Sequence, residues 1–133
     1  MKAREYLSQG RRIQDRIDAL RKQKDLVMST TVRLRATISG GGDNSRKAET
    51  AVQLIDELNR QIDKLETTKL DIIRTIDKIT TNEYAAILID HYLNDITLYD
   101  ISMARGYDYK TIQRWHDKGL SIVQRMLDKN KRV

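Results

Sequence analysis

Residues 39–45 read Ser-Gly-Gly-Gly-Asp-Asn-Ser and contain three of the six glycines of this 133-residue chain. Clusters of Gly, Ser, Asn and Asp favour turns, because these residues accept backbone conformations that larger side chains resist. Regular helical patterns lie on both sides of this stretch, and the chain contains no proline to interrupt them. We therefore expect a short loop at residues 39–45 between two long helices.

Apolar side chains recur in alternating steps of three and four residues on both sides of the loop. Before it, seven of ten stepped positions are apolar or aromatic: Tyr6, Ile13, Ile17, Leu20, Val27, Leu34 and Ile38. After it, nine of ten are apolar: Ala48, Ala51, Ile55, Leu58, Ile62, Leu65, Ile72, Ile76 and Ile79. A mean spacing of 3.5 residues keeps one narrow stripe facing a partner helix. Residues 1–79 are therefore predicted to form a long antiparallel coiled-coil hairpin.

Two kinds of residue complicate this hairpin. The polar stripe positions Lys24 and Lys69 are either register devices or lysines whose stems pack while their ammonium groups reach water. Further apolar side chains lie just beside the stripe: Leu26, Val52, Leu54, Leu70 and Ile73. Because two helices bury only one stripe each, we expect a second copy of the chain to cover these residues as a homodimer or higher oligomer.

The segment after the hairpin begins with a helix-start signal. Thr80 and Glu83 match a capping box, in which each side chain bonds the other residue's backbone amide. The helix should continue through Leu93 and end at Asn94-Asp95. Four side chains are expected on its inner face: Tyr84, Ile87, Leu88 and Tyr92.

Two further helices are predicted in the last third of the chain. Thr97 should cap a short helix over residues 98–104, and Gly106 should end it in a left-handed conformation. Asp108 should cap a long last helix with this buried stripe: Ile112, Trp115, Leu120, Val123 and Leu127. Residues 80–133 thus form a small three-helix module with the layout of a helix-turn-helix, and the whole chain is all-α.

Charge changes sign inside this module. Residues 80–104 contain four acidic residues and no Lys or Arg, whereas residues 105–133 contain eight Lys or Arg against three Asp. A solvated basic face is the simplest explanation for the cations at the C-terminal end, which suit the helix dipole. That explanation does not cover Arg105, Lys110, Arg114 and Lys118, in the turn and the first half of the helix. A basic helix there favours DNA binding through counterion release.

Residues 101–114, Ile-Ser-Met-Ala-Arg-Gly-Tyr-Asp-Tyr-Lys-Thr-Ile-Gln-Arg, resemble the promoter-reading helix-turn-helix of sigma factor region four. The wider layout is similar to phage-encoded sigma-like transcriptional regulators of Gram-positive bacteria, the ArpU and RinA type of late-gene activator. Residues 2–7, the glycine-broken hairpin and the Tyr107-x-Tyr109 pair carry the likeness across the chain. Two positions depart from the pattern, since Arg105 precedes the turn glycine and Ser102 stands where alanine is common.

The resemblance implies a DNA-binding surface on the last helix. It places Tyr109, Lys110, Gln113 and Arg114 towards base edges and Thr111 and Lys118 towards phosphate, with Arg105 adding charge from the turn. Arginine pairs bidentately with guanine and glutamine with adenine. Helical spacing puts the first four on the face opposite the buried stripe. Tyr109 could equally be a packed aromatic residue.

Several other functions find no support in the residues. There is no cysteine, and His91 and His116 have no acidic cluster at ligand spacing, so we expect no metal and no cofactor. His116 is expected to be a partly exposed packing residue. No Ser-His-Asp arrangement or phosphate-binding loop occurs, so we expect no enzyme. No run of 18 apolar residues and no secretory start occur, so a cytoplasmic protein without membrane contact is expected.

The sequence therefore predicts a regulator of transcription, of phage or phage-satellite origin, that binds double-stranded DNA and regulates a promoter, more as an activator than as a repressor. The hairpin would dimerise or contact RNA polymerase. An alternative stays open: the hairpin could be the main functional part of a packaging adaptor that binds a phage terminase subunit or RNA polymerase.

Overall fold

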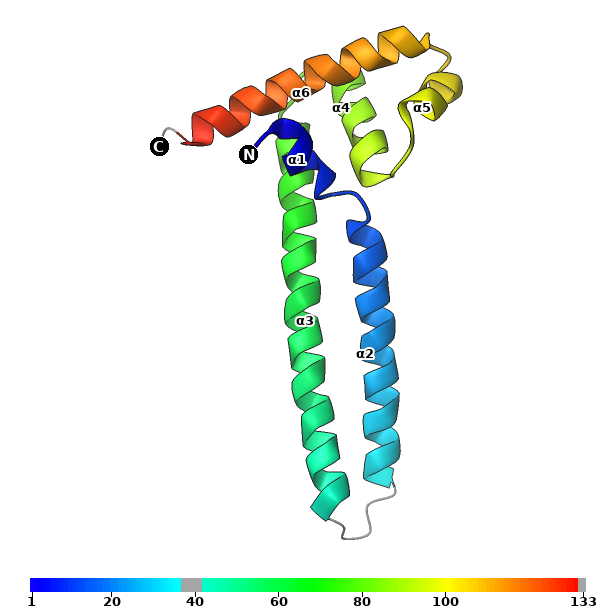
Figure 1. Cartoon of the computed structure of the whole chain (residues 1–133), viewed down its shortest axis with the longest axis vertical. Coiled ribbons are helices and arrows are strands. Elements are labelled where there is room, and N and C mark those ends of the chain that lie inside the picture. The colour runs from blue at the N-terminus through cyan, green and yellow to red at the C-terminus, as the bar shows by residue number, and fades with distance from the viewer. Residues whose placement is uncertain (37–41, 132–133) are drawn as a thin grey trace. The chain divides into compact units, whose positions relative to one another are not determined.

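The computed structural model describes residues 1–36 and 42–131, and all regular secondary structure in these residues is helical (Figure 1). This confirms the all-α prediction. No helix in the described part of the chain is both long and apolar enough to cross a membrane. The chain divides into two compact units: residues 1–14 together with 68–133 form one, and residues 15–67 form the other. This division differs from the boundary expected at residue 79.

The unit of residues 15–67 is an antiparallel pair of helices, made from α2 (Ile13–Ala36) and α3 (Gly42–Asp77) (Figure 1). The predicted stripes face each other, and their most deeply buried members include Ile17, Ala48, Leu58 and Ile62. Beside the stripe, Arg21 of α2 pairs with Glu66 of α3 at 2.6 Å. Of the loop expected at residues 39–45, residues 39–41 lie outside the described residues, and residues 42–45 belong to α3.

The first arm of the hairpin is not the continuous helix expected from residue 6. A short α1 (Ala3–Ser8) ends before α2 begins, and Arg12 between them has a positive φ of 60°. Gly10 is buried in this break. A Cβ on Gly10 would lie 2.7 Å from Cδ2 of Leu93 and 3.2 Å from the carbonyl oxygen of Leu7. The helix therefore breaks where close contact with another segment leaves no room for a side chain.

The unit formed by residues 1–14 and 68–133 has its main core where α1, the end of α3 and the later helices meet. Its buried members are Ala3, Leu7, Ile72, Ile76, Ile79, Leu88, Tyr92 and Val123. A polar contact joins α1 to α6, because the amide of Ala3 donates to Oε1 of Gln124 at 2.7 Å. In the same unit, Nζ of Lys69 in α3 donates to Oε1 of Gln14, at the start of α2, at 2.6 Å. The first residues and the C-terminal helices therefore share one core, which explains why the boundary is not at residue 79.

Four consecutive helical segments complete this unit: α4 (Asn82–Leu88), η1 (Ile89–Leu93), α5 (Leu98–Arg105) and α6 (Tyr109–Lys131). The single helix expected up to Leu93 thus ends in a π-helical turn, η1. The capping box at Thr80 is not formed. Thr81 is instead the residue before α4, and its side chain makes no capping hydrogen bond.

Candidate nucleic-acid interface

The turn between α5 and α6 is built by local hydrogen bonds. Oγ1 of Thr97 accepts from the amide of Asp100 at 3.1 Å, which confirms the predicted start of α5. Gly106 has a φ of 75° and ends α5 in the left-handed region, as predicted. The amides of Gly106 and Tyr107 both donate to the carbonyl of Ser102, at 3.0 and 3.2 Å. The direction in which α6 leaves the turn is therefore fixed by the backbone.

Ser102 is buried, although its position is one where a sigma-like pattern favours alanine. Its hydroxyl donates to the carbonyl of Tyr99 at 2.6 Å. A buried hydroxyl is costly only when it lacks a partner. The serine is therefore accommodated inside the turn.

A small apolar core holds α5 against α6. Ile87 of α4, Ile101 of α5 and Ile112 of α6 are each at most 1% exposed, and Ile96, Leu98 and Trp115 pack around them. This confirms the expected inward position of Ile112 at the start of α6. Because Ile112 faces inward, residues half a turn away on α6 must face outward.

The outward face of α6 carries most of the predicted DNA-binding residues. Lys110, Gln113, Arg114 and Lys118 are exposed, and Thr111 is half-buried. Arg114 donates to Oγ1 of Thr111 at 3.4 Å within the same helix. Among the described residues, Lys110, Gln113 and Lys118 have no hydrogen-bond or ion-pair partner. The structure thus brings these five residues together on an open surface.

Tyrosines surround this basic surface. Tyr109 is 43% exposed and meets Tyr99 of α5 edge to face, with ring centroids 6.1 Å apart. Tyr107 packs in the same way on Trp115 at 4.9 Å. Tyr109 is therefore both packed and accessible, and both of its predicted roles remain compatible with this position.

Arg105 is placed differently from the other predicted residues. Its Nη2 lies 2.9 Å from Oδ2 of Asp90, which joins the end of α5 to η1. This ion pair is partly exposed, and a neighbouring carboxylate offsets the charge that Arg105 would offer to a phosphate. Arg105 thus belongs to the scaffold behind the turn as well as to the surface.

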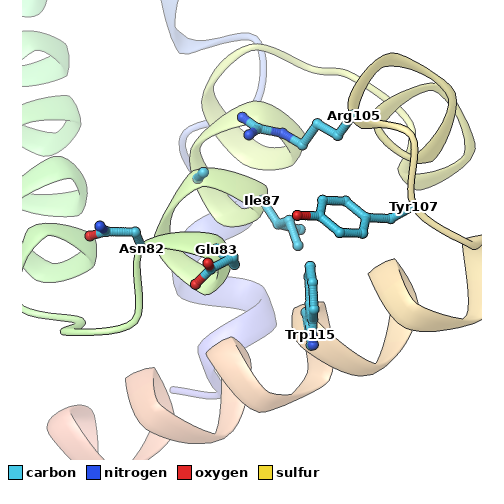
Figure 2. Close-up of a pocket in the computed structure, with 7 residues that line it drawn as sticks. Asn82, Glu83, Ile87, Arg105, Tyr107 and Trp115 are labelled. Atoms are coloured by element: carbon cyan, nitrogen blue, oxygen red, sulfur yellow. The ribbon is translucent and has the colours of Figure 1, made fainter.

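A hollow of about 260 Å³ lies between α4, the turn and α6 (Figure 2). Its lining residues are Asn82, Glu83, Ala86, Ile87, Arg105, Tyr107 and Trp115. Figure 2 shows Tyr107 and Trp115 on one side, with Asn82 and Glu83 approaching from the start of α4. The hollow combines aromatic rings with one carboxylate and one guanidinium, and the sequence pattern of the last helix gave no sign of it.

A buried polar cluster supports α6 from behind. His116 is 4% exposed, so the expectation that it is partly exposed was wrong. Its Nδ1 lies 3.2 Å from Oδ1 of Asp117, and its Nε2 lies 2.8 Å from the hydroxyl of Tyr92. A carboxylate only accepts, so Nδ1 of the neutral ring carries the proton and Nε2 accepts from Tyr92. Both hydrogen bonds are therefore satisfied by the uncharged imidazole.

His91 lies beside this cluster, with its ring centroid 5.3 Å from that of His116. Its Nδ1 donates to the carbonyl of Ile96 at 2.8 Å, and its Nε2 accepts from Nη2 of Arg11 at 2.7 Å. Burial lowers the pKa of His91 and of His116 below the ordinary value of 6.5. Positive charge on Arg11 lowers the pKa of His91 further. Both imidazoles are therefore uncharged at neutral pH.

Within residues 1–36 and 42–131, no group of three or more His, Asp or Glu side chains is placed to hold a metal ion. No protein-family model matches this chain, and no curated protein or solved structure is significantly similar to it.

Proposed function

We propose that this chain is a sequence-specific DNA-binding transcriptional regulator in which α6 is the recognition helix in a major groove. One observation carries the proposal: Lys110, Gln113 and Arg114 lie together on the exposed face of α6, directly after a left-handed turn at Gly106. The cations of Lys110 and Arg114, the amide of Gln113 and the phenol of Tyr109 are groups that hydrogen-bond to base edges or to phosphates. The opposite face of α6 is unavailable to DNA, because Ile112 on that face packs in the core with Ile87 and Ile101.

The proposal includes the setting suggested by the resemblance to phage late-gene activators. The regulator would act in the cytoplasm of a bacterial host, more as an activator than as a repressor, and it would belong to a phage or phage satellite. It would function as a homodimer or higher oligomer, with the hairpin contacting either a second copy or RNA polymerase.

The direct test starts with selection of bound duplexes from a random DNA pool by the full-length protein. Gel-shift titrations on the enriched sequence then compare wild type with Lys110→Ala/Arg114→Ala at several salt concentrations. We expect the double variant to bind more weakly and its salt dependence to become shallower, because two cations that displace counterions from the duplex are lost. Lys22→Ala/Arg60→Ala, which removes two exposed cations of the other unit, is the charge-matched control. Unchanged affinity and slope in the α6 variant would remove the recognition-helix assignment.

A second function is favoured by a different observation, an apolar groove in the unit of residues 15–67. In this alternative the hairpin is the main functional part, and the protein is an adaptor for a phage terminase subunit or RNA polymerase. Full-length variants separate the two functions better than fragments, because residues 80–133 alone would lack Leu7, Ile72 and Ile76 from their core. A regulator should lose function through substitutions in α6, and an adaptor through substitutions in the groove.

A further inference from the structure

The groove between α2 and α3 is open and apolar. It has a volume of about 540 Å³, and its apolar walls include Leu26 and Leu34 of α2 and Leu54 of α3. Leu26 is 68% exposed although it lines the groove. Covering a leucine side chain is favourable in proportion to the apolar area that is removed from water. A partner that covers Leu26 would therefore gain favourable binding free energy from burial of this side chain.

Positive charge stands at one end of the same groove. Arg46 and Lys47 of α3 line it, both are exposed, and neither side chain has a hydrogen-bond or ion-pair partner among the described residues. Among the described residues that line the groove, none is an aspartate or glutamate. The groove thus combines an uncovered apolar wall with uncompensated cations.

We propose that this groove binds an amphipathic α-helix of another protein, with an apolar stripe flanked by aspartate and glutamate. On α3 the groove extends from Arg46 to Leu54, which at the helical rise corresponds to about 12 Å, or about two turns. A helix that lies in a groove of this length presents apolar side chains at positions i, i+3 or i+4, and i+7. Its carboxylates would pair with Arg46 and Lys47.

A second copy of this chain is a less suitable occupant. If two copies met through this same face, each would bring its own Arg46 and Lys47 and no groove carboxylate to neutralise them. An acidic helix removes that repulsion and covers Leu26 at the same time. The inference is independent of DNA binding, because no groove residue belongs to the unit that contains α6.

The test uses the full-length protein and a labelled synthetic peptide with Leu at i, i+3, i+4 and i+7 and Glu at the flanking positions. Binding is followed by fluorescence anisotropy. We expect Leu26→Asp to weaken binding about tenfold or more. Leu70→Asp changes a leucine of similar exposure, 62%, outside the groove and should leave binding unchanged. Circular dichroism melting verifies that both variants are folded.

Charge reversal tests the second half of the proposal. Arg46→Glu/Lys47→Glu should weaken binding of the Glu peptide and strengthen binding of a matched peptide with Lys at the flanking positions. Lys22→Glu/Arg60→Glu should do neither. Equal binding of both peptides by wild type, or an unaffected Leu26→Asp variant, would overturn the proposal. Sedimentation equilibrium without peptide gives a further check. A wild-type dimer that Leu26→Asp dissociates would also overturn the proposal, because a second copy would then occupy the groove. The groove variants should bind the selected DNA as wild type does in gel shifts, so failure of this proposal is distinguishable from failure of the proposed DNA binding.

Discussion

The hydroxyl of Tyr92 donates to Nε2 of His116 across 2.8 Å, and both side chains are at most 4% exposed. The bond joins η1 to α6, the helix that carries the basic surface. Arg11 lies over the ring of Tyr92, with its Cζ 5.5 Å from the ring centroid. The N-terminal segment thus contacts the pair that anchors the middle of α6.

Stability should fall in mild acid. Burial lowers the pKa of His116 and of His91 below 6.5, so between the lowered values and 6.5 the unfolded chain binds more protons than the folded chain. The contribution of these two histidines to the unfolding free energy is therefore at its maximum above about pH 7, and it decreases as the pH falls through 6.5. Urea unfolding between about pH 7.5 and 5 measures this. In His91→Gln/His116→Gln the decrease over that interval should be much smaller, and an equal decrease would show that other groups cause it.

Removing only the hydroxyl of Tyr92, with its aromatic ring kept, should lower the stability of the folded protein. Tyr92→Phe leaves Nε2 of His116 buried without its donor, which costs about 1 to 3 kcal/mol of unfolding free energy. The matched control is Tyr99→Phe, because Tyr99 is 58% exposed and should change stability by less than about 0.5 kcal/mol. Chemical denaturation of the two variants side by side gives the comparison, and equal stabilities would contradict the assigned hydrogen bond.

The N-terminal helix should stabilise the C-terminal helices. Leu7 is fully buried in the shared core, so Leu7→Ala is expected to cost about 2 to 5 kcal/mol. Hydrogen exchange should show the loss of protection at amides of α6, far along the chain from the substitution. Exposed Leu26 provides the control, since Leu26→Ala should leave α6 protection unchanged. If Leu7→Ala affected only α1 and α2, the two segments would not share a core.

Two glycines should respond to alanine for different reasons. At Gly106 there is open space for a Cβ but φ is 75°, so Gly106→Ala should cost about 1 to 2 kcal/mol through the backbone, and Gly106→Asn less. At Gly10 a Cβ would press on Leu93 and the carbonyl of Leu7, and Gly10→Ala should cost about 1 to 3 kcal/mol through crowding. Shortening Leu93 to alanine should recover part of the second loss and none of the first. Thermal melts of the single and double variants separate the two causes.

If α6 binds DNA as proposed, Arg105 should matter less than Lys110. Asp90 already neutralises part of the Arg105 charge, whereas Lys110 has no partner in the described part of the chain. Arg105→Ala should therefore weaken DNA binding less than Lys110→Ala in the same gel-shift series. Asp90→Ala, which frees Arg105, should strengthen binding. The opposite order would mean that Arg105 leaves Asp90 to contact DNA.

Features that depend on near neighbours in the chain could be predicted from the sequence. Thr97 caps α5 and Gly106 ends it because each interaction involves residues three or four positions away. The outward position of Lys110 and Gln113 follows from helical periodicity around Ile112. The basic face of the candidate site could therefore be identified before the structure was known.

Features that depend on distant residues could not be predicted in this way. The helix break at Gly10 was not expected, because it depends on contact with Leu93. His116 was expected to be partly exposed, because local spacing does not reveal that its partner Tyr92 lies on another helical segment. Arg105 pairs with Asp90, and local spacing carries no information about that contact.

The hydrogen bond from Ala3 to Gln124, two residues 121 positions apart, has a consequence for synthesis on the ribosome. At ribosomal elongation rates, roughly 6 to 24 s pass between the translation of these two residues. The hairpin needs nothing made later and can form in that interval. The core that buries Leu7, in contrast, includes Val123 of α6 and is incomplete until that helix has been made. Until then the apolar N-terminal segment is partly exposed, and exposed apolar surface makes folding intermediates prone to aggregation.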